Sequence, residues 1–188
     1  MLIVASGAIV FALLPKKAIP PPPLEVTLNE VERRDNRLWL KASNQLFSGL
    51  LVEYYANSNR QSETEFVEGL IHGTSKGWHT NGTLQVLEHF TNGVSHGIRT
   101  KWYSNGATQR VATIVAGQLN GPYQAYHDNG QLSQQITLIA GNPEGESLAW
   151  HPDGSLKART FHKEGELKEQ SFWEPGEQLV LPAAQPIQ

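Results

Sequence analysis

Residues 93–116 read GVSHGIRTKWYSNGATQRVATIVA, and the neighbouring blocks of 24 residues repeat the same pattern. These blocks are GLIHGTSKGWHTNGTLQVLEHFTN (69–92), GQLNGPYQAYHDNGQLSQQITLIA (117–140) and GNPEGESLAWHPDGSLKARTFHKE (141–164). Glycines recur at this period in three registers: Gly69, Gly93, Gly117, Gly141 and Gly165; Gly49, Gly73, Gly97, Gly121 and Gly145; and Gly82, Gly106, Gly130 and Gly154. A fixed period held in several registers indicates a repeat protein with one supersecondary unit per repeat.

Each unit predicts one β-hairpin. Runs of about six to eight residues, rich in aromatic and β-branched side chains, have a usual strand length. Between them lie pairs that suit a two-residue type I′ turn, in which both central residues need positive φ: Asn81-Gly82, Asn105-Gly106, Asn129-Gly130 and Asp153-Gly154. The glycine that opens each unit marks the second turn. Since no segment here is long and apolar at helical spacing, we expect an all-β fold, an elongated meander of consecutive antiparallel β-hairpins with about a dozen strands.

Two rows of large apolar residues keep the same period. One row is Tyr54, Trp78, Trp102, Tyr126 and Trp150, and the other is Phe66, Phe90, Ile114 and Leu138. Equivalent positions in successive repeats share one face of a sheet, because side chains alternate between faces along a strand. We therefore expect the two rows to pack together as the core side of the meander.

A third row follows the first by one residue and is expected to face the other way: Tyr55, His79, Tyr103, His127 and His151. Three histidines at equivalent positions raise the question of a metal site. Equivalent strands of successive hairpins are two strand spacings apart, about 9–10 Å, whereas zinc needs its nitrogen ligands at about 2.0–2.1 Å. We therefore predict no metal here. The open alternatives are rings that merely cover the sheet, and a binding strip roughly 40 Å long that suits an extended peptide, a glycan or a flat protein face.

Catalytic motifs are missing from the sequence. The carboxylates Asp128, Asp153, Glu164, Glu166 and Glu169 lie in or beside turns and the C-terminal end, where no cleft is expected to bring a glycosidase pair together. The serines form no nucleophile elbow, and neither a P-loop nor a dinucleotide fingerprint occurs. Zero cysteines exclude disulfides, thiolate catalysis and cysteine-ligated zinc. We predict no enzyme activity, no catalytic residue and no cofactor.

The phrases LFSGLLVEYYANS, GWHTNG, GIRTKWYSNGA and GPYQAYHDNGQL resemble the bacterial MORN-repeat variant of proteins labelled YwqK-family antitoxins. The resemblance covers about residues 46 to 178. It implies a β-repeat scaffold without a transferable catalytic signature, and an antitoxin-like role is one hypothesis that it raises. Eukaryotic MORN arrays, which the chain resembles more distantly, are linked to membrane-lipid contact, oligomerisation and the flanks of enzyme domains.

The ends of the chain depart from the repeat. We predict an apolar signal-anchor-like segment at 1–14, a proline-rich linker at 15–23, a repeat domain at 24–180 and a tail at 181–188. Within the repeat domain, 24–44 is expected to form a capping hairpin around Asp35-Asn36, and 165–180 a degenerate last repeat. The apolar run has the length of a signal-peptide core rather than of a spanning helix. It either anchors the repeats in the bacterial envelope or packs on the sheet or another protein, so the predicted location is membrane-anchored or periplasmic, with a cytoplasmic location as the alternative.

The charge composition of the chain limits the class of partner that it can bind. Lys and Arg number 15 against 18 Asp and Glu, for a formal charge of −3, and no basic stripe is present. The electrostatic footprint of nucleic-acid binding is therefore missing. We expect a non-enzymatic scaffold for protein–protein interaction, either antitoxin-like or a subunit of an envelope complex. The alternative is a membrane-surface module, anchored by residues 1–14, that contacts lipid head groups or cell-wall glycans.

Overall fold

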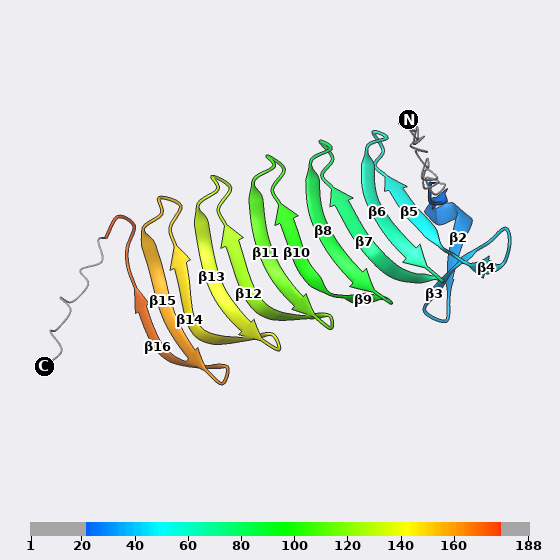
Figure 1. Ribbon diagram of the computed structural model, residues 1–188. Coiled ribbons are helices and arrows are strands. Elements are labelled where there is room, and N and C mark those ends of the chain that lie inside the picture. The colour runs from blue at the N-terminus through cyan, green and yellow to red at the C-terminus, as the bar shows by residue number, and fades with distance from the viewer. Residues whose placement is uncertain (1–21, 178–188) are drawn as a thin grey trace, which may run out of the picture.

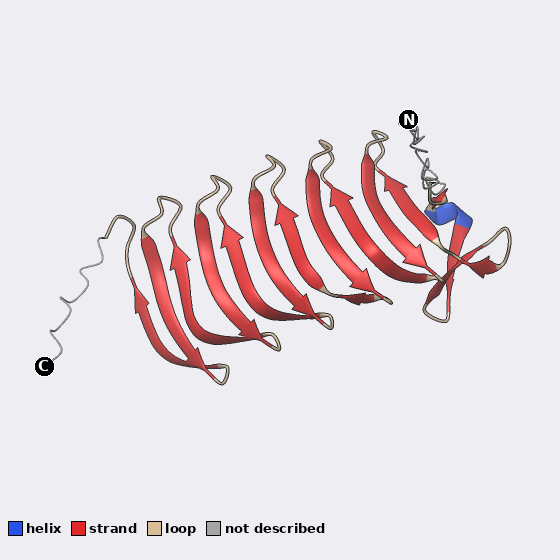
Figure 2. Cartoon of the chain, in the orientation of Figure 1, coloured by secondary structure: helices blue, strands red, loops and turns tan. Residues whose placement is uncertain are grey.

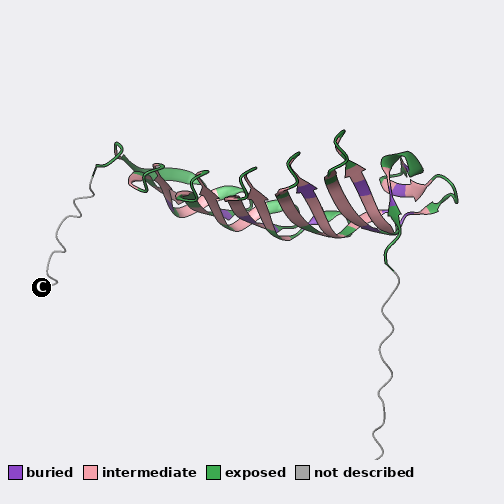
Figure 3. Cartoon of the chain, turned by 90° about the horizontal axis from the view of Figure 1, so that it is seen from above, coloured by how far each residue is buried: buried purple, intermediate pink, exposed green. Residues whose placement is uncertain are grey.

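The computed structural model describes residues 22–177 and confirms an all-β meander. The apolar segment 1–14, most of the linker 15–23 and the tail 181–188 lie outside the described residues. In the described part, a 13-stranded sheet carries the repeats, and a small three-stranded sheet lies at its N-terminal end (Figures 1 and 2). Seen from above, the large sheet is a single thin layer (Figure 3).

The large sheet runs in the order β1-β5-β6-β7-β8-β10-β11-β12-β13-β14-β15-β16, with the short β9 paired to β8. All neighbours are antiparallel except β1, which lies parallel to β5. The repeat strands are β5 (Gly49–Tyr54), β6 (Arg60–Val67), β7 (Leu70–Trp78), β8 (Leu84–Thr91), β9 (Val94–Ser95), β10 (Gly97–Trp102), β11 (Thr108–Val115), β12 (Gln118–Tyr126), β13 (Leu132–Ile139), β14 (Asn142–Trp150), β15 (Leu156–Lys163) and β16 (Glu166–Phe172).

The two-residue type I′ turns occur at the glycine that opens each unit. Ala116 and Gly117 have φ of 50° and 81°, and Val115 pairs with Gln118 across them. Both central residues therefore have the positive φ that a type I′ turn requires. The equivalent pairs with positive φ are Glu68-Gly69, Asn92-Gly93, Ala140-Gly141 and Glu164-Gly165.

The prediction of type I′ turns at the Asn-Gly and Asp-Gly pairs is wrong. In the turn between β7 and β8, the Gly82 N–H donates to the His79 carbonyl (2.8 Å), and the His79 N–H donates to the Thr83 carbonyl (2.8 Å). Positive φ is found at Gly82 (87°) but not at Asn81. This is a type I turn followed by a left-handed glycine, the three-residue hairpin loop with a G1 bulge. Asn81 therefore keeps a negative φ, and it stabilises this turn through a hydrogen bond to its side chain rather than through a left-handed backbone.

The expectation that the two apolar rows pack together is also wrong. Gly97 pairs with Ile114, so these residues share a face, whereas Trp102 lies five residues from Gly97 along β10. An odd separation along a strand puts side chains on opposite faces. The row that contains Ile114 therefore lies on one face and the row that contains Trp102 on the other. Phe66, Ile114 and Leu138 are buried, while Tyr54 is 49% exposed and the other members of its row are half-buried.

The densest core lies at the N-terminal end. There the 3-10 helix η1 (Leu28–Glu30) and the strands β1 (Glu25–Val26), β2 (Val31–Arg34), β3 (Arg37–Leu40) and β4 (Gln45–Leu46) cover the first repeat. Phe47 is completely buried, and its ring lies 5.7 Å from that of Phe66. Asp35 and Asn36, both with positive φ, join β2 to β3. Since an isolated sheet edge exposes apolar side chains and backbone groups, this cap satisfies the open end of the array.

Candidate functional site

The row Tyr55, His79, Tyr103, His127 and His151 begins the turns rather than lying within the strands. Each of these residues directly follows a strand, and each ring is half-buried. The N–H of each member donates to a carbonyl four residues later in its own turn, as Tyr103 does to Ala107 at 2.9 Å. The backbone of the row is therefore fixed by its own hairpin.

The side chains of this row connect one repeat to the next. The Tyr hydroxyl or the His Nε2 of each member lies within hydrogen-bond distance of a main-chain carbonyl at, or directly after, the end of a strand in the following repeat. A carbonyl only accepts, so each histidine carries its proton on Nε2. The contacts are Tyr55 Oη to Trp78 O (2.7 Å), His79 Nε2 to Trp102 O (2.9 Å), Tyr103 Oη to Tyr126 O (2.8 Å), His127 Nε2 to Trp150 O (2.9 Å) and His151 Nε2 to Trp173 O (3.0 Å).

We call these five residues the ring ladder. Its contacts are a structural role that the sequence did not reveal, because each bond joins residues 22 or 23 positions apart. One of the two ring-nitrogen positions of each histidine is already used within the array. Binding of a partner by the ring ladder stays a prediction, and any such binding would have to use ring faces and edges.

A second ladder runs beside the first and was missed from the sequence. The Asn side chain of each turn donates through Nδ2 to a carbonyl in the next turn: Asn57 to Thr80 (3.1 Å), Asn81 to Ser104 (2.8 Å), Asn105 to Asp128 (3.0 Å) and Asn129 to Pro152 (2.7 Å). The recurrence of Asn at the 24-residue period was the available signal. The sequence predicts these Asn residues for positive φ, whereas in the structure the Nδ2 group of each side chain is needed to donate to the next turn.

Two members of the ring ladder line one open pocket of about 370 Å³. His79 and Tyr103 border it together with Lys101 and the neutral polar side chains of Gln85, Ser104 and Gln109. The other three members do not line this pocket. The pocket therefore offers one cation and several neutral hydrogen-bonding groups, which suits a polar or anionic group rather than an apolar one.

Three cations lie close together on the face of the sheet that carries Ile114. Lys101 and Arg110 are directly opposite each other on β10 and β11, and Arg99 is paired with Ala112 two positions along. Arg99 forms an ion pair with Glu88, which also accepts a hydrogen bond from Ser95. Within residues 22–177, neither Lys101 nor Arg110 takes part in an ion pair. This part of the sheet thus has a local excess of positive charge.

The opposite face carries a line of exposed apolar side chains near the type I′ turns. We call it the apolar row; its members are Val67, Val94, Ile98, Val115, Ile139 and Phe161, each between 40% and 55% exposed. They share a face because Ile98 pairs with Thr113, which lies two residues from Val115, and equivalent positions repeat this geometry. Val115 and Arg110 are five residues apart on β11, so the apolar row and the cations lie on opposite faces.

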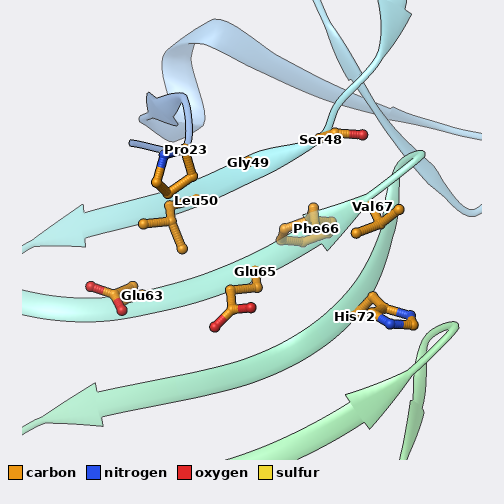
Figure 4. Close-up of a pocket in the computed structure, with 9 residues that line it drawn as sticks. All are labelled: Pro23, Ser48, Gly49, Leu50, Glu63, Glu65, Phe66, Val67 and His72. Atoms are coloured by element: carbon orange, nitrogen blue, oxygen red, sulfur yellow. The ribbon is translucent and has the colours of Figure 1, made fainter. Parts of the chain in front are cut away.

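A further open pocket of about 580 Å³ lies where the cap meets the first two repeats (Figure 4). Glu63 and Glu65 line it, with Pro23, Leu50 and His72 around them. Two carboxylates beside a histidine would be candidates for acid–base chemistry. Here Glu63 is engaged by Arg60 and Lys76, and Glu65 accepts a hydrogen bond from the Thr74 hydroxyl. These carboxylates therefore act as cross-strand partners within the sheet.

Within the described range, no three His, Asp or Glu side chains are grouped to hold a metal ion. The same range contains no helix that is long and apolar enough to span a membrane.

The comparison with known proteins identifies a family only for segments of the repeats. None of the curated proteins compared with the chain matches it. The profile of the family described as MORN repeat variant matches residues 71–92 and 119–139, which are the hairpins β7–β8 and β12–β13 of the meander. The described sheet continues the same hairpin geometry on both sides of these segments, so the chain contains MORN-variant repeats within a longer β-array.

Proposed function

We propose that this protein is a non-enzymatic repeat scaffold that binds a partner protein across the apolar row. The observation that supports this proposal is the row itself, with large apolar side chains repeatedly left 40–55% exposed along one face. Contiguous exposed apolar surface on a soluble domain commonly marks an interaction site. MORN repeats are commonly protein- or membrane-interaction scaffolds, which agrees with this use.

The geometry of the apolar row favours a broad partner. The row runs from β6 to β15, eight strand spacings in the order of the sheet, or roughly 40 Å. Between Val94 and Ile139 the paired positions on this face are Thr91, Thr113, Gln118 and Thr137, which carry no charge. This uncharged stretch is the centre of the face, since Glu65 lies two residues from Val67 on β6 and Phe161 is paired with Glu146. A long surface with an uncharged centre suits a protein face, whereas a small metabolite needs a concave pocket.

We also propose which class of partner the protein binds and where it is located. A toxin is one class of partner, as the resemblance to antitoxins implies, and a subunit of an envelope complex is the other. The apolar run 1–14 favours the second, with the protein membrane-anchored or periplasmic. A cytoplasmic location would favour the first.

The test is a charge placed in the apolar row. Val115→Lys with Ile139→Lys should reduce capture of the partner about tenfold or more, because two lysines would be desolvated in an apolar interface. The matched control, Ser104→Lys with Gln131→Lys, adds the same charge at exposed positions in the turns at the other end of the hairpins. Capture is measured by cross-linking the full chain in native membranes and quantifying the cross-linked partner by mass spectrometry.

Equal capture by both variants, with unchanged circular dichroism, would contradict the proposal. The alternative function is a membrane-surface module, which the same exposed apolar side chains would also serve. Binding of the wild-type chain to neutral phosphatidylcholine vesicles, abolished by Val115→Lys with Ile139→Lys, would support that alternative instead.

A further inference from the structure

Counting residues 45–68 as the first repeat, repeat three (93–116) departs from its neighbours where two cations face each other. Lys101 and Arg110 occupy directly opposite positions on β10 and β11, and both side chains are half-buried. Like charges at directly opposite positions destabilise a sheet, and partial burial strengthens the repulsion because the local dielectric constant is lower than in water. The pair therefore costs stability in the isolated protein.

The fold does not need these cations. In the other repeats the position of Lys101 is held by Glu53, Gly77, Ala125 and Ala149, and the position of Arg110 by Ser62, Val86, Gln134 and Ala158. These residues pair in the same register, as Ala125 does with Gln134 and Ala149 with Ala158. None of these pairs contains two charges of the same sign, so the hairpin forms without them, and the two cations of repeat three call for an explanation outside the hairpin.

The surroundings leave the positive charge uncompensated. Glu88 is the carboxylate at the next level of the same face, and it is already paired with Arg99. Along the level of Lys101 itself, the nearest carboxylate on that face is Glu53 on β5, four strand spacings away, or roughly 19 Å. That distance exceeds the Debye length at physiological ionic strength, about 8 Å, so Glu53 does not neutralise the pair.

The adjoining pocket completes an anion-binding arrangement. Lys101 lines the pocket of about 370 Å³, with Gln85, Gln109 and Ser104 as neutral polar groups around it. Carboxylates prefer a guanidinium or ammonium group together with additional hydrogen-bond donors. The residues beside the cations are uncharged, with Val86 opposite Lys101 on β8 and the small Ala125 opposite Arg110 on β12, which lets an extended chain lie across the strands.

We infer that Lys101 and Arg110 form the centre of a second interaction surface, on the face opposite the apolar row, that binds an acidic peptide segment of a partner protein. Charge complementarity identifies the occupant: two cations and amide donors match one or two Asp or Glu side chains. An anionic membrane or a nucleic acid is attracted by a wider field of positive charge, whereas this chain is net negative, at −3. The inference does not rest on the proposed function, since it concerns different residues on a different face.

A labelled hexaglutamate peptide tests the inference with the full chain. Binding is measured by fluorescence anisotropy at low and at physiological salt. The variant Lys101→Ala with Arg110→Gln installs the residues that repeat four has at the same positions, Ala125 and Gln134, so its fold is expected to survive. We expect the affinity to fall about tenfold or more, because two charge-assisted contacts are lost.

The matched control is Lys157→Ala with Arg159→Gln, which removes the same charge from β15. This control measures the general electrostatic effect of the net charge, which both variants share. That effect should leave the peptide affinity within about twofold of wild type. The inference is overturned if both variants lose affinity equally, if neither does, or if the wild-type chain does not bind the peptide. It is also overturned if vesicles containing phosphatidylserine, rather than the peptide, show the dependence on Lys101 and Arg110.

The melting temperature gives an independent readout. Since the two like charges repel each other in the free protein, Lys101→Ala with Arg110→Gln should melt at the same temperature as wild type or higher. A clear fall in the melting temperature would show that the cations stabilise the fold, and the inference would then lose its premise.

Discussion

A single turn residue in this array makes contacts in two directions. The Oδ1 of Asn81 accepts a hydrogen bond from the Thr83 N–H (3.1 Å), which shapes its own turn, and its Nδ2 donates to the Ser104 carbonyl of the next turn (2.8 Å). An amide is the only side-chain group of this size that both donates and accepts in this way. The 24-residue recurrence of Asn therefore follows from the stacking of hairpins as much as from the turn.

The ring ladder predicts a measurable loss at Tyr103. Tyr103→Phe removes the hydroxyl that donates to the Tyr126 carbonyl and leaves that partly buried carbonyl without this partner. The free energy of unfolding should fall by about 1 kcal/mol, the usual net value of one hydrogen bond. Urea denaturation of the full chain checks this, and Tyr126→Phe is the control, since the Tyr126 hydroxyl donates to Gln124 on its own strand and not to another repeat. An equal loss in both variants would mean that the ladder bond adds nothing.

Asp153 ends the Asn ladder, because a carboxylate accepts but cannot donate to a following turn. Hydrogen bonds from the Ser155 hydroxyl and backbone N–H lower the pKa of Asp153. The next strand, β16, has no following hairpin in the described residues, so the donor that the other repeats need is not required here. The Asn-to-Asp change is thus consistent with the end of the array.

Asp153 also predicts a pH dependence. A carboxyl group whose pKa is lowered by folding contributes stability that is present above its unfolded pKa and is lost as the pH falls through its folded pKa. Asp153→Asn keeps the acceptor for Ser155 but does not titrate. The melting temperature of wild type minus that of Asp153→Asn should therefore be constant near neutral pH and decrease below about pH 4. A difference that grows as the pH is lowered would contradict this assignment.

At the scale of the hairpin, two turn types alternate and differ in strain. Four of the three-residue loops place glycine at the left-handed position, as at Gly106 (φ 86°), and the first places Ser58 there (φ 65°). Some type I′ turns place alanine at this position, as at Ala116 and Ala140 (φ 50° and 48°). A Cβ atom makes the left-handed region costly by roughly 1–2 kcal/mol per residue. The turns with alanine, glutamate or serine at a left-handed position are therefore more strained than those with glycine.

Replacing Ala116 by Asn should stabilise the protein. Asn tolerates positive φ better than Ala, and Asn-Gly is a preferred type I′ pair, already present at Asn92-Gly93. The gain should be about 0.5–1 kcal/mol in the free energy of unfolding, measured by urea denaturation. A loss of stability would mean that the Ala116 methyl group makes contacts that matter more than its backbone strain.

Gly106→Val is expected to act in the opposite direction. A Cβ at Gly106 meets no atom within 4 Å, so the effect isolates the backbone conformation. Forcing a β-branched residue into positive φ should cost about 1–2 kcal/mol. An unchanged melting temperature would contradict the left-handed assignment of this turn.

At the scale of the whole molecule, stability is distributed unevenly. The repeats form one layer in which each strand contacts its two neighbours, so their burial is partial, while the cap encloses Phe47 completely. Such an array is expected to behave as a chain of nearest-neighbour units held at its end by the cap.

Two large-to-small substitutions compare the cap with the sheet. Phe47→Ala should cost about 3–5 kcal/mol, the usual range for a fully buried phenylalanine, because it removes the ring that packs on Phe66. Trp102→Ala should cost less, since Trp102 is only half-buried in the single-layer sheet. Guanidinium denaturation of both variants checks the order, and a larger loss for Trp102→Ala would show that the thin sheet, rather than the cap, carries most of the stability.

The amino-acid sequence by itself determined the repeat, its hairpin content and its register. The repeat period, the turn residues and the alternation of apolar and polar side chains can all be recognised within the few residues that one hairpin spans. The register even determines that Trp102 and Ile114 face opposite ways, because the turn length sets which residues pair. The position of the type I′ turns was not determined in this way, since Asn-Gly suits two different loops and a side-chain bond to the next repeat selects one of them.

The tertiary structure alone decided the roles of the candidate residues. The row from Tyr55 to His151 was expected to face outward, and it is the stacking of repeats that brings each ring to a carbonyl 22 or 23 residues away. Likewise, the opposition of Lys101 and Arg110 and the exposure of the apolar row depend on which strands become neighbours and on what covers each face. Hydrogen bonds and burial of this kind are formed between repeats, so no single repeat contains the information that fixes them.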